Sequence, residues 1–301
     1  MKRFFVKFII TMSIPLMILV LIEAVIRGTP NSYKHKLSII ENNKNDVELL
    51  IMGSSHANNG LNPHLFPIKT INCAMGGQGI TIDDFLLKRY IGQMPNLKYI
   101  ILPVDYPTLF LPDAVGSPDR YMYYNVYYKF EPNIFSLDNY EIFHPHSVKA
   151  KLWALFRDDF TIYDDSLGFH GINDLSFTSD ASETVKWQTT ENISNKTIDK
   201  NICAFSNIAK MTEINGIKLI IITMPVHKSF YELSDTAQMK FTRNTIQNIM
   251  IQHNNCIYLD YYATLFNDSC YSDATHLNII GADSFTKLLV HDLDSMRIFE
   301  K

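Results

Sequence analysis

The sequence has no excess of basic residues, no block of like charges, no low-complexity tract and no internal repeat. It contains 27 Lys and Arg against 31 Asp and Glu, which gives a formal net charge of -4. Proteins that bind nucleic acid usually present a strong positive field, so nucleic acid is not an expected partner. The 301 residues are 47% hydrophobic and 19% charged, which is a globular composition with material for one large domain or two small ones.

Cysteine is scarce. The four cysteines are Cys73, Cys203, Cys256 and Cys270, and no C-x-x-C pair is present, which argues against a structural zinc site. No other metal-ligand pattern is apparent, so we expect neither a metal nor a cofactor. Cys256 and Cys270 could form a disulfide in an exported domain. Because Cys73 and Cys256 lie in apolar runs, buried free thiols are the favoured interpretation.

An apolar run near the N-terminus, residues 8–22, follows three basic residues and ends at Glu23. The whole stretch has roughly the 17 residues that a helix needs to cross a bilayer, and the cations before it favour a cytoplasmic N-terminus. Residues 1–30 are therefore predicted to be an uncleaved signal anchor, with the rest of the chain outside the cytoplasm. A cleaved signal peptide and a buried helix are the alternatives, but no small-residue cleavage site is evident.

Apolar runs of strand length alternate with helical patterns in the rest of the chain. The strand-like runs are 47–53, 70–75, 99–105, 217–225 and 256–261, and the helical patterns are 81–94, 199–216, 235–253 and 278–293. The strand-like runs are nearly continuous, which is typical of parallel strands buried on both faces. The pattern predicts an α/β fold, a three-layer α/β/α sandwich around a mostly parallel five-stranded sheet.

The domain organisation follows from this alternation. Residues 31–46 are polar and are predicted to form a tether with a short helix, and residues 47–301 form the α/β domain. The stretch from about 109 to 195 breaks the rhythm and is predicted to be an inserted subregion, which could form a lid or a wall of the cleft. Its tyrosine-rich segment either packs the insertion against the body or stacks on sugar rings.

Three short motifs carry candidate chemistry. "GSSH" places Ser55 directly after the first strand, where a nucleophile can be held rigidly. "DATH" places Asp273 and His276 three residues apart before the last helix, as a general base and its orienting carboxylate require. "NCAMGGQG" follows the second strand, where a glycine amide could face an oxyanion. Taken singly, these motifs are a turn, a helix cap with a surface histidine, and a glycine-rich loop.

Together, the order of these motifs resembles the SGNH, or GDSL-like, hydrolase superfamily, from about Val47 to Leu293. "GSS" and "HLN" followed by "GA" look closest to a membrane-anchored branch related to lipoteichoic-acid D-alanylation and alginate O-acetylation proteins. The resemblance implies a flavodoxin-like sheet, Ser55 as nucleophile, His276 as base and Asp273 as its orienter. It also implies that the backbone amides of Ser55 and Gly77 form part of the oxyanion hole.

One position departs from that resemblance. The superfamily usually supplies an Asn after the third strand as an oxyanion donor, but this chain has Asp105, and an ionised carboxylate cannot donate a hydrogen bond. Asp105 therefore has a structural or substrate role, is protonated, or is replaced in function by a neighbour. The candidate neighbours are Asn58, Asn59 and Tyr106. His56 and His227 are further candidates to line or support the site.

The resemblance implies a membrane-anchored, extracytoplasmic serine esterase or O-acyltransferase that acts on acyl esters, such as acetyl esters, of a cell-surface polysaccharide. A transferase would draw its acyl group from a separate multi-span membrane acyltransferase. The alternative is a catalytically weak or inactive binding or assembly protein in a complex that modifies or exports an envelope glycan. A lipase or thioesterase would need a long apolar groove, of which the sequence gives no clear sign.

Overall fold

The computed structural model describes residues 2–117, 119–131, 133–160, 162–177, 181–189 and 194–299. The chain divides into two compact units. The smaller unit comprises Met1–Leu37 and Gly116–Tyr163, and the larger unit comprises Ser38–Val115 and Asp164–Lys301. Part of the predicted insertion, residues 178–180 and 190–193, lies outside the described residues.

The larger unit is built on a five-stranded sheet in the order β2-β1-β3-β4-β5. The strands are β1 (Leu49–Ile51), β2 (Thr70–Asn72), β3 (Tyr99–Pro103), β4 (Lys218–Thr223) and β5 (Cys256–Asp260). Every neighbouring pair is parallel, which confirms the predicted α/β fold and its flavodoxin-like order. The strands are shorter than the apolar runs because buried residues such as Met52 and Val104 continue beyond the paired positions.

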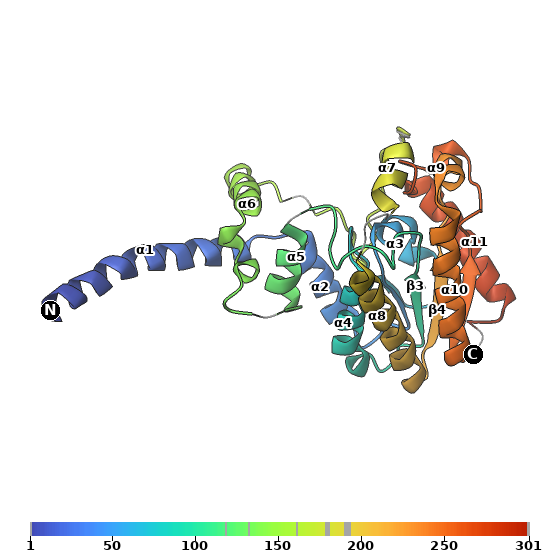
Figure 1. The fold of residues 1–301 in the computed structure, drawn as a ribbon, viewed down its shortest axis with the longest axis horizontal. Coiled ribbons are helices and arrows are strands. Elements are labelled where there is room, and N and C mark those ends of the chain that lie inside the picture. Colours follow the sequence, from blue (N-terminus) through green and yellow to red (C-terminus); the bar gives the residue numbers. More distant parts are fainter. Residues whose placement is uncertain are drawn as a thin grey trace. The chain divides into compact units, whose positions relative to one another are not determined.

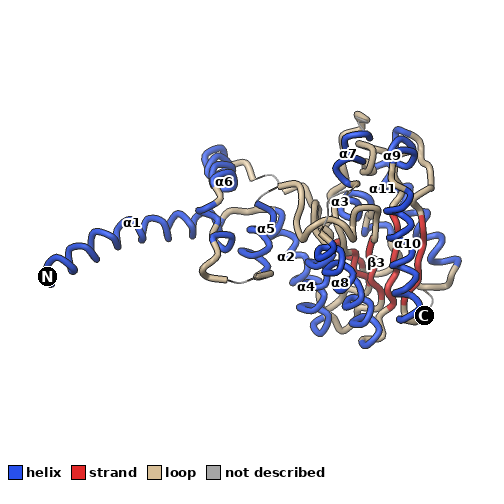
Figure 2. The backbone as a smooth tube through the Cα atoms, viewed as in Figure 1, coloured by secondary structure: helices blue, strands red, loops and turns tan. Residues whose placement is uncertain are grey.

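Helices cover both faces of this sheet (Figure 1). The helices of the larger unit are α3 (Ser55–Gly60), α4 (Ile80–Tyr90), α7 (Ala181–Gln188), α8 (Asn195–Ile214), α9 (Lys228–Leu233), α10 (Thr236–Gln252) and α11 (Ile279–Ser295). α2 (Ser32–Asn43) precedes them, and its first residues belong to the smaller unit. Short 3₁₀ turns are η1 (Pro63–Leu65), η2 (Ile91–Gln93) and η6 (Asp268–Cys270). α3 contacts α11, whereas α4 and α10 both contact α8, so the helices form two layers with the strands between them (Figure 2).

The core explains why the strand sequences are continuous apolar runs. Leu49 and Ile51 of β1 pack with Ala57 of α3 and Phe285 of α11 in one cluster. Because side chains alternate along a strand, Leu50 points to the opposite face, where it is also buried. Both faces of the sheet are therefore covered, as a parallel sheet requires.

The cysteines are free thiols, and Cys73, Cys256 and Cys270 are buried. Cys256 and Cys270 therefore form no disulfide here, in agreement with the favoured interpretation of the sequence. Burial, with a smaller contribution from the charge of Glu213, raises the pKa of the Cys256 thiol to about 12, so it stays protonated near neutral pH.

The smaller unit contains the N-terminal helix and short helical segments. These are α1 (Lys2–Gly28), α5 (Asp119–Tyr123), a π-helical turn η3 (Tyr124–Tyr128), η4 (Leu137–Asn139), η5 (Glu141–Phe143) and α6 (Pro145–Arg157). Over Arg3–Gly28, α1 is long and apolar enough to cross a membrane. The tyrosine-rich segment packs inside the unit, because the rings of Tyr123 and Tyr124 lie 4.8 and 5.2 Å from the ring of Tyr33.

Candidate active site

The turn after β1 presents Ser55 at the carboxyl edge of the sheet. Gly53 has a φ of +112°, a conformation that L side chains rarely adopt, and a Cβ there would lie 3.2 Å from Pro103 Cδ. Glycine is therefore needed for the chain to leave β1 at this angle. Ser55 is the first residue of α3 and is only partly buried.

The buried carboxyl group of Asp83 in α4 accepts a hydrogen bond from the turn that precedes Ser55. Gly53 N–H donates to Asp83 Oδ1 at 3.0 Å, and Gln78 Nε2 donates to the same oxygen at 2.7 Å. Burial raises the pKa of Asp83 to about 7; the two hydrogen bonds lower it and the charge of Asp84 raises it further. The helical pattern of residues 81–94 gives no indication of this role. The one signal in the sequence is a pair of acidic residues in the first turns of the helix that follows the glycine-rich loop.

The structure brings Ser55, His276 and Asp273 together in one chain of hydrogen bonds. Ser55 Oγ lies 2.8 Å from His276 Nε2, within the range expected for a nucleophile and its base. His276 Nδ1 lies 2.8 Å from Asp273 Oδ2. A carboxylate only accepts hydrogen bonds, so Nδ1 carries the proton and Nε2 is free to accept the serine proton. His276 lies two residues before Asn278, whose side chain caps α11.

The carboxylate of Asp273 is fixed as well as charged. Its Oδ1 accepts hydrogen bonds from the backbone amides of Thr275 and His276, both at 2.8 Å. Burial by itself raises the pKa of Asp273, but the hydrogen bonds and the charge of His276 outweigh burial and hold this pKa well below its usual range. Asp273 is therefore ionised at neutral pH and orients the imidazole through Nδ1.

The glycine-rich loop after β2 lies beside this turn. Met75 N–H donates to Gly53 O at 3.1 Å, which ties the two loops together. Gly77 has a φ of +69°, and its carbonyl accepts from Val115 N–H at 3.0 Å. Among the described residues, none accepts a hydrogen bond from the Gly77 amide. The amide of Ser55 also has no acceptor within α3, because the first amides of a helix are unpaired by its own carbonyls.

Asp105 forms a second histidine–carboxylate pair next to the first. His56 Nδ1 lies 2.8 Å from Asp105 Oδ2, and Met224 N–H donates to Asp105 Oδ1 at 2.7 Å. The rings of His56 and His276 meet edge to face, with centroids 5.1 Å apart. Burial lowers the pKa of His56, but the charge of Asp105, its hydrogen bond and the charge of Asp273 together raise that pKa above its ordinary value. The protonated form of His56 is therefore more favoured beside the triad than in a free imidazole.

The other candidate residues mostly support the loops around the site. Tyr106 is buried, and its hydroxyl pairs with Thr189 Oγ1 at 2.7 Å and accepts from Asp235 N–H at 3.1 Å. His227 caps α9, because its Nδ1 accepts from Ser229 N–H at 3.2 Å, which leaves Nε2–H for Asp268 at 3.1 Å.

Asn58 and Asn59 are both buried in α3, and the carbonyl of Asn58 accepts from His170 N–H at 3.1 Å. No group of three His, Cys, Asp or Glu side chains in the described part of the chain could hold a metal ion.

No family model matches this sequence, and no curated protein matches it significantly. Among solved structures, a proposed acylhydrolase from Bacteroides fragilis shares 12% identity, covers 88% of this chain and 97% of its own, and has a TM-score of 0.44. A catalytic mutant of an acetylxylan esterase from Geobacillus stearothermophilus shares 8% identity over 83% of this chain and 94% of its own, with a TM-score of 0.42. Similarity at this level assigns neither an activity nor a substrate to this chain.

Proposed function

We propose that this protein is a serine acyl-transfer enzyme of the SGNH type. The observation that carries the proposal is the unbroken relay from Ser55 Oγ through His276 to Asp273, with both hydrogen bonds at 2.8 Å. The three residues come from opposite ends of the sequence and meet at the carboxyl edge of a parallel sheet, where ligands bind in folds of this kind. Ser55 is only partly buried, which distinguishes this arrangement from a fully buried structural network.

The reaction follows from the direction of these hydrogen bonds. Ser55 Oγ attacks the ester carbonyl carbon while its proton moves to His276 Nε2, and Asp273 stabilises the imidazolium that forms. The backbone amides of Ser55 and Gly77 donate to the oxyanion. The imidazolium then gives its proton to the departing alcohol, and an acyl-Ser55 ester remains. The same steps then run in reverse and transfer the acyl group from Ser55 to an acceptor. The acceptor is water in an esterase and the hydroxyl of a second substrate in a transferase.

The oxyanion side of the site differs from the superfamily pattern. A buried Asp105 stands where an Asn donor is usual, but its carboxylate is paired with His56. We assign to His56 the role of the missing Asn donor, which is to stabilise the oxyanion. His56 would do so with a positive charge, whereas the Asn amide offers only a partial positive charge. A cation close to the reacting centre stabilises developing negative charge more strongly than a neutral dipole. On this assignment, Asp105 keeps His56 charged and does not itself face the oxyanion.

The setting of the reaction is proposed from α1 and from the sequence resemblance. α1 would anchor the chain as a single span, with the larger unit outside the cytoplasm. A fixed catalytic unit at the cell surface suits a substrate that is fixed there too, such as an acyl, for example acetyl, ester of an envelope polysaccharide. In the transferase form, a multi-span membrane acyltransferase would supply the acyl group.

The test is release of p-nitrophenol from p-nitrophenyl acetate by the full chain in detergent. Ser55→Ala and His276→Ala should each reduce turnover by on the order of 10³-fold or more, because one variant lacks the nucleophile and the other lacks the base that activates it. Ser54→Ala is the matched control, because Ser54 is the adjacent serine and its side chain makes no cap hydrogen bond. Adding a polysaccharide acceptor then separates transfer from hydrolysis.

Equal turnover by wild type and Ser55→Ala would refute the catalytic proposal. In that case the second candidate, a binding or assembly protein that retains the fold, would be favoured. The presence of Asp105 in place of the Asn donor is the observation behind this second candidate. Retained binding of an acylated glycan by Ser55→Ala, without any turnover by the wild type, would support it.

A further inference from the structure

The exposed part of α6 in the smaller unit carries large apolar side chains beside the polar His146, Lys149 and Arg157, whereas two of its polar side chains are buried. Leu152, Trp153 and Phe156 are 47%, 55% and 84% exposed. Ser147 and Lys151, on the opposite side, are almost completely buried. A surface helix of a water-soluble domain has the reverse arrangement, with its apolar stripe toward the core. The side chains of α6 are therefore arranged for an apolar environment outside the protein.

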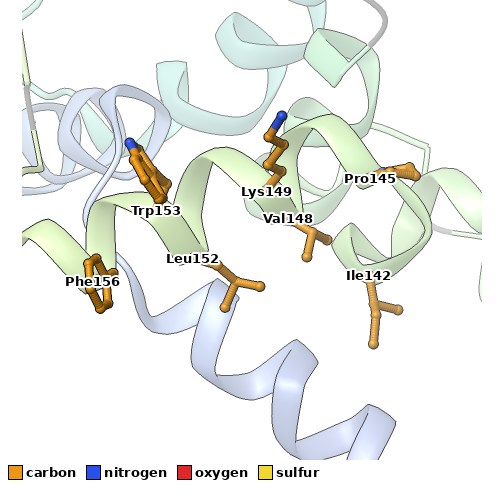
Figure 3. Close-up of a pocket in the computed structure, with 7 residues that line it drawn as sticks. All are labelled: Ile142, Pro145, Val148, Lys149, Leu152, Trp153 and Phe156. Carbon is orange, nitrogen blue, oxygen red and sulfur yellow. The ribbon is translucent and has the colours of Figure 1, made fainter.

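Three apolar residues of α6 form a stripe, because Val148, Leu152 and Phe156 recur every four residues. They line an open hollow together with Ile142 of η5, Pro145, Lys149 and Trp153. Figure 3 shows the three stripe residues and Ile142 pointing to one side of the helix in this view, whereas Trp153 and Lys149 point to the other side. We call Ile142, Val148, Leu152, Trp153 and Phe156 the interfacial face.

Hydrogen bonds connect this region to the outer end of α1. The carboxylate of Glu23 accepts from the backbone amides of Glu141 and Ile142, at 3.1 and 2.8 Å. Lys151 on the buried side of α6 donates to the carbonyl of Ile26 at 3.3 Å and forms an ion pair with Glu141. The start of α6 is therefore held at the level of Glu23 along α1.

The length of α1 fixes where that level lies in a bilayer. The uncharged stretch from Phe8 to Ile22 rises roughly 22 Å at about 1.5 Å per residue. A bilayer has a hydrocarbon core of roughly 30 Å, so a span bounded by Lys7 and Glu23 is short. Glu23 then lies at or just inside the outer boundary, where Arg27 forms an ion pair with its carboxylate and the amides of η5 donate hydrogen bonds to it. Residues bonded to Glu23 must share this depth.

We propose that the interfacial face of α6 lies in the outer polar–apolar boundary of the membrane, beside the emerging α1. This inference rests on the proposed anchoring by α1. Trp153 suits that boundary, where its ring contacts acyl chains and its N–H reaches the headgroups. Arg157 lies 4.4 Å from the centre of the Trp153 ring, and such cations extend toward lipid phosphates. Phe135 and Leu137, 89% and 60% exposed in the same unit, offer further apolar contacts.

The test uses the fact that the chain contains only two tryptophans, Trp153 and Trp187. Full-length Trp187→Phe and Trp153→Phe are each reconstituted in vesicles of phosphatidylcholine and phosphatidylglycerol, with or without bromine on the acyl carbons nearest the headgroup. Trp153 should lose on the order of half of its emission in brominated vesicles, since an interfacial helix buries its apolar face roughly 5–10 Å deep. Trp187, 53% exposed in the larger unit, is the control and should not lose emission.

Flotation of the same vesicles separates this inference from the proposed function. If the chain floats with the vesicles but bromine does not quench Trp153, the anchor stands and the inference is wrong. Strong quenching of Trp153 by acrylamide, a water-soluble quencher, in these vesicles would have the same meaning, because it would show that the face is exposed to water. If the chain does not float with the vesicles, both the anchoring by α1 and the inference are wrong. The catalytic proposal is unaffected by that result, because esterase turnover is measured in a separate assay. A Phe156→Glu variant that floats should show reduced quenching of Trp153.

Discussion

Asp83→Asn should change how the stability of the larger unit depends on pH. Asp83 is 2% exposed, and its ordinary pKa of 3.8 rises to about 7 because burial disfavours the charged form. A carboxyl group with a raised pKa in the folded state contributes stability that is fully present below about pH 4. That contribution is lost as the pH rises to about 7, because the unfolded chain releases this proton more readily than the folded one.

The magnitude follows from the size of the pKa rise. At about 1.4 kcal/mol for each pKa unit, a rise from 3.8 to about 7 corresponds to on the order of 4 kcal/mol. The asparagine variant has no proton to lose, yet its amide oxygen can still accept from Gly53 and Gln78. Any fixed cost of the amide is the same at every pH. The free energy of unfolding of the variant, minus that of the wild type, should therefore increase by on the order of 4 kcal/mol between pH 4 and pH 8.

The assay is urea unfolding of the full chain in detergent at a series of pH values. In a Trp153→Phe background, emission comes from Trp187 alone and reports on the larger unit. Asp294→Asn, at an exposed carboxylate near the end of α11, is the matched control. If the free energies of unfolding of wild type and Asp83→Asn changed with pH in parallel, this carboxyl group would have the same pKa in the folded and the unfolded chain. The reasoning from burial would then be wrong.

Three further perturbations follow from the same geometry. Asp273→Asn should reduce kcat roughly 10²- to 10⁴-fold, because an amide cannot favour the tautomer that accepts the serine proton; ester turnover measures this, and an unchanged kcat would remove the residue from the mechanism. Asp105→Asn should lower turnover and cost about 3 kcal/mol in urea unfolding, because it leaves His56 buried without its counter-charge; a faster variant would show that an Asn donor is simply missing. Gly281→Ala should cost about 3 kcal/mol or more of unfolding free energy, because the new Cβ would lie 2.0 Å from Cys270 O, and an unshifted urea midpoint would contradict this close approach.

The sequence predicts the sheet because its strands are buried on both faces. Continuous apolar runs such as 217–225 have no other stable place in a globular domain, and β4 lies within this run. The end of α8 was also visible in the sequence, because Gly216 takes a φ of +67° just after the helix. The positions of Ser55, Asp273 and His276 relative to the strands follow from the same reasoning, because the carboxyl ends of parallel strands share one edge.

Partners of buried polar groups could not be predicted in this way. The sequence marks Asp105 as unusual, but pairing with His56 depends on how β1 and β3 lie side by side, which no local pattern encodes. Asp83 looked like an ordinary residue of a helix because its partner, Gly53, is 30 positions away. The apolar side of α6 was likewise invisible, since its period is that of any amphipathic helix. Only the burial of Lys151 shows which side faces the protein.

Two carboxyl groups near Ser55 differ because of the partners that surround them. Asp83 receives hydrogen bonds from neutral donors only, and burial raises its pKa to about 7. Asp273 is more exposed and faces an imidazole, so its pKa falls below its usual range. The triad carboxylate therefore remains ionised while the carboxyl group that fixes the nucleophile turn titrates near neutral pH. Below about pH 7 the carboxyl group bonded to Gly53 is neutral, and the larger unit is more stable. Above about pH 7 the same group is a buried charge, which lowers the free energy of unfolding of the larger unit.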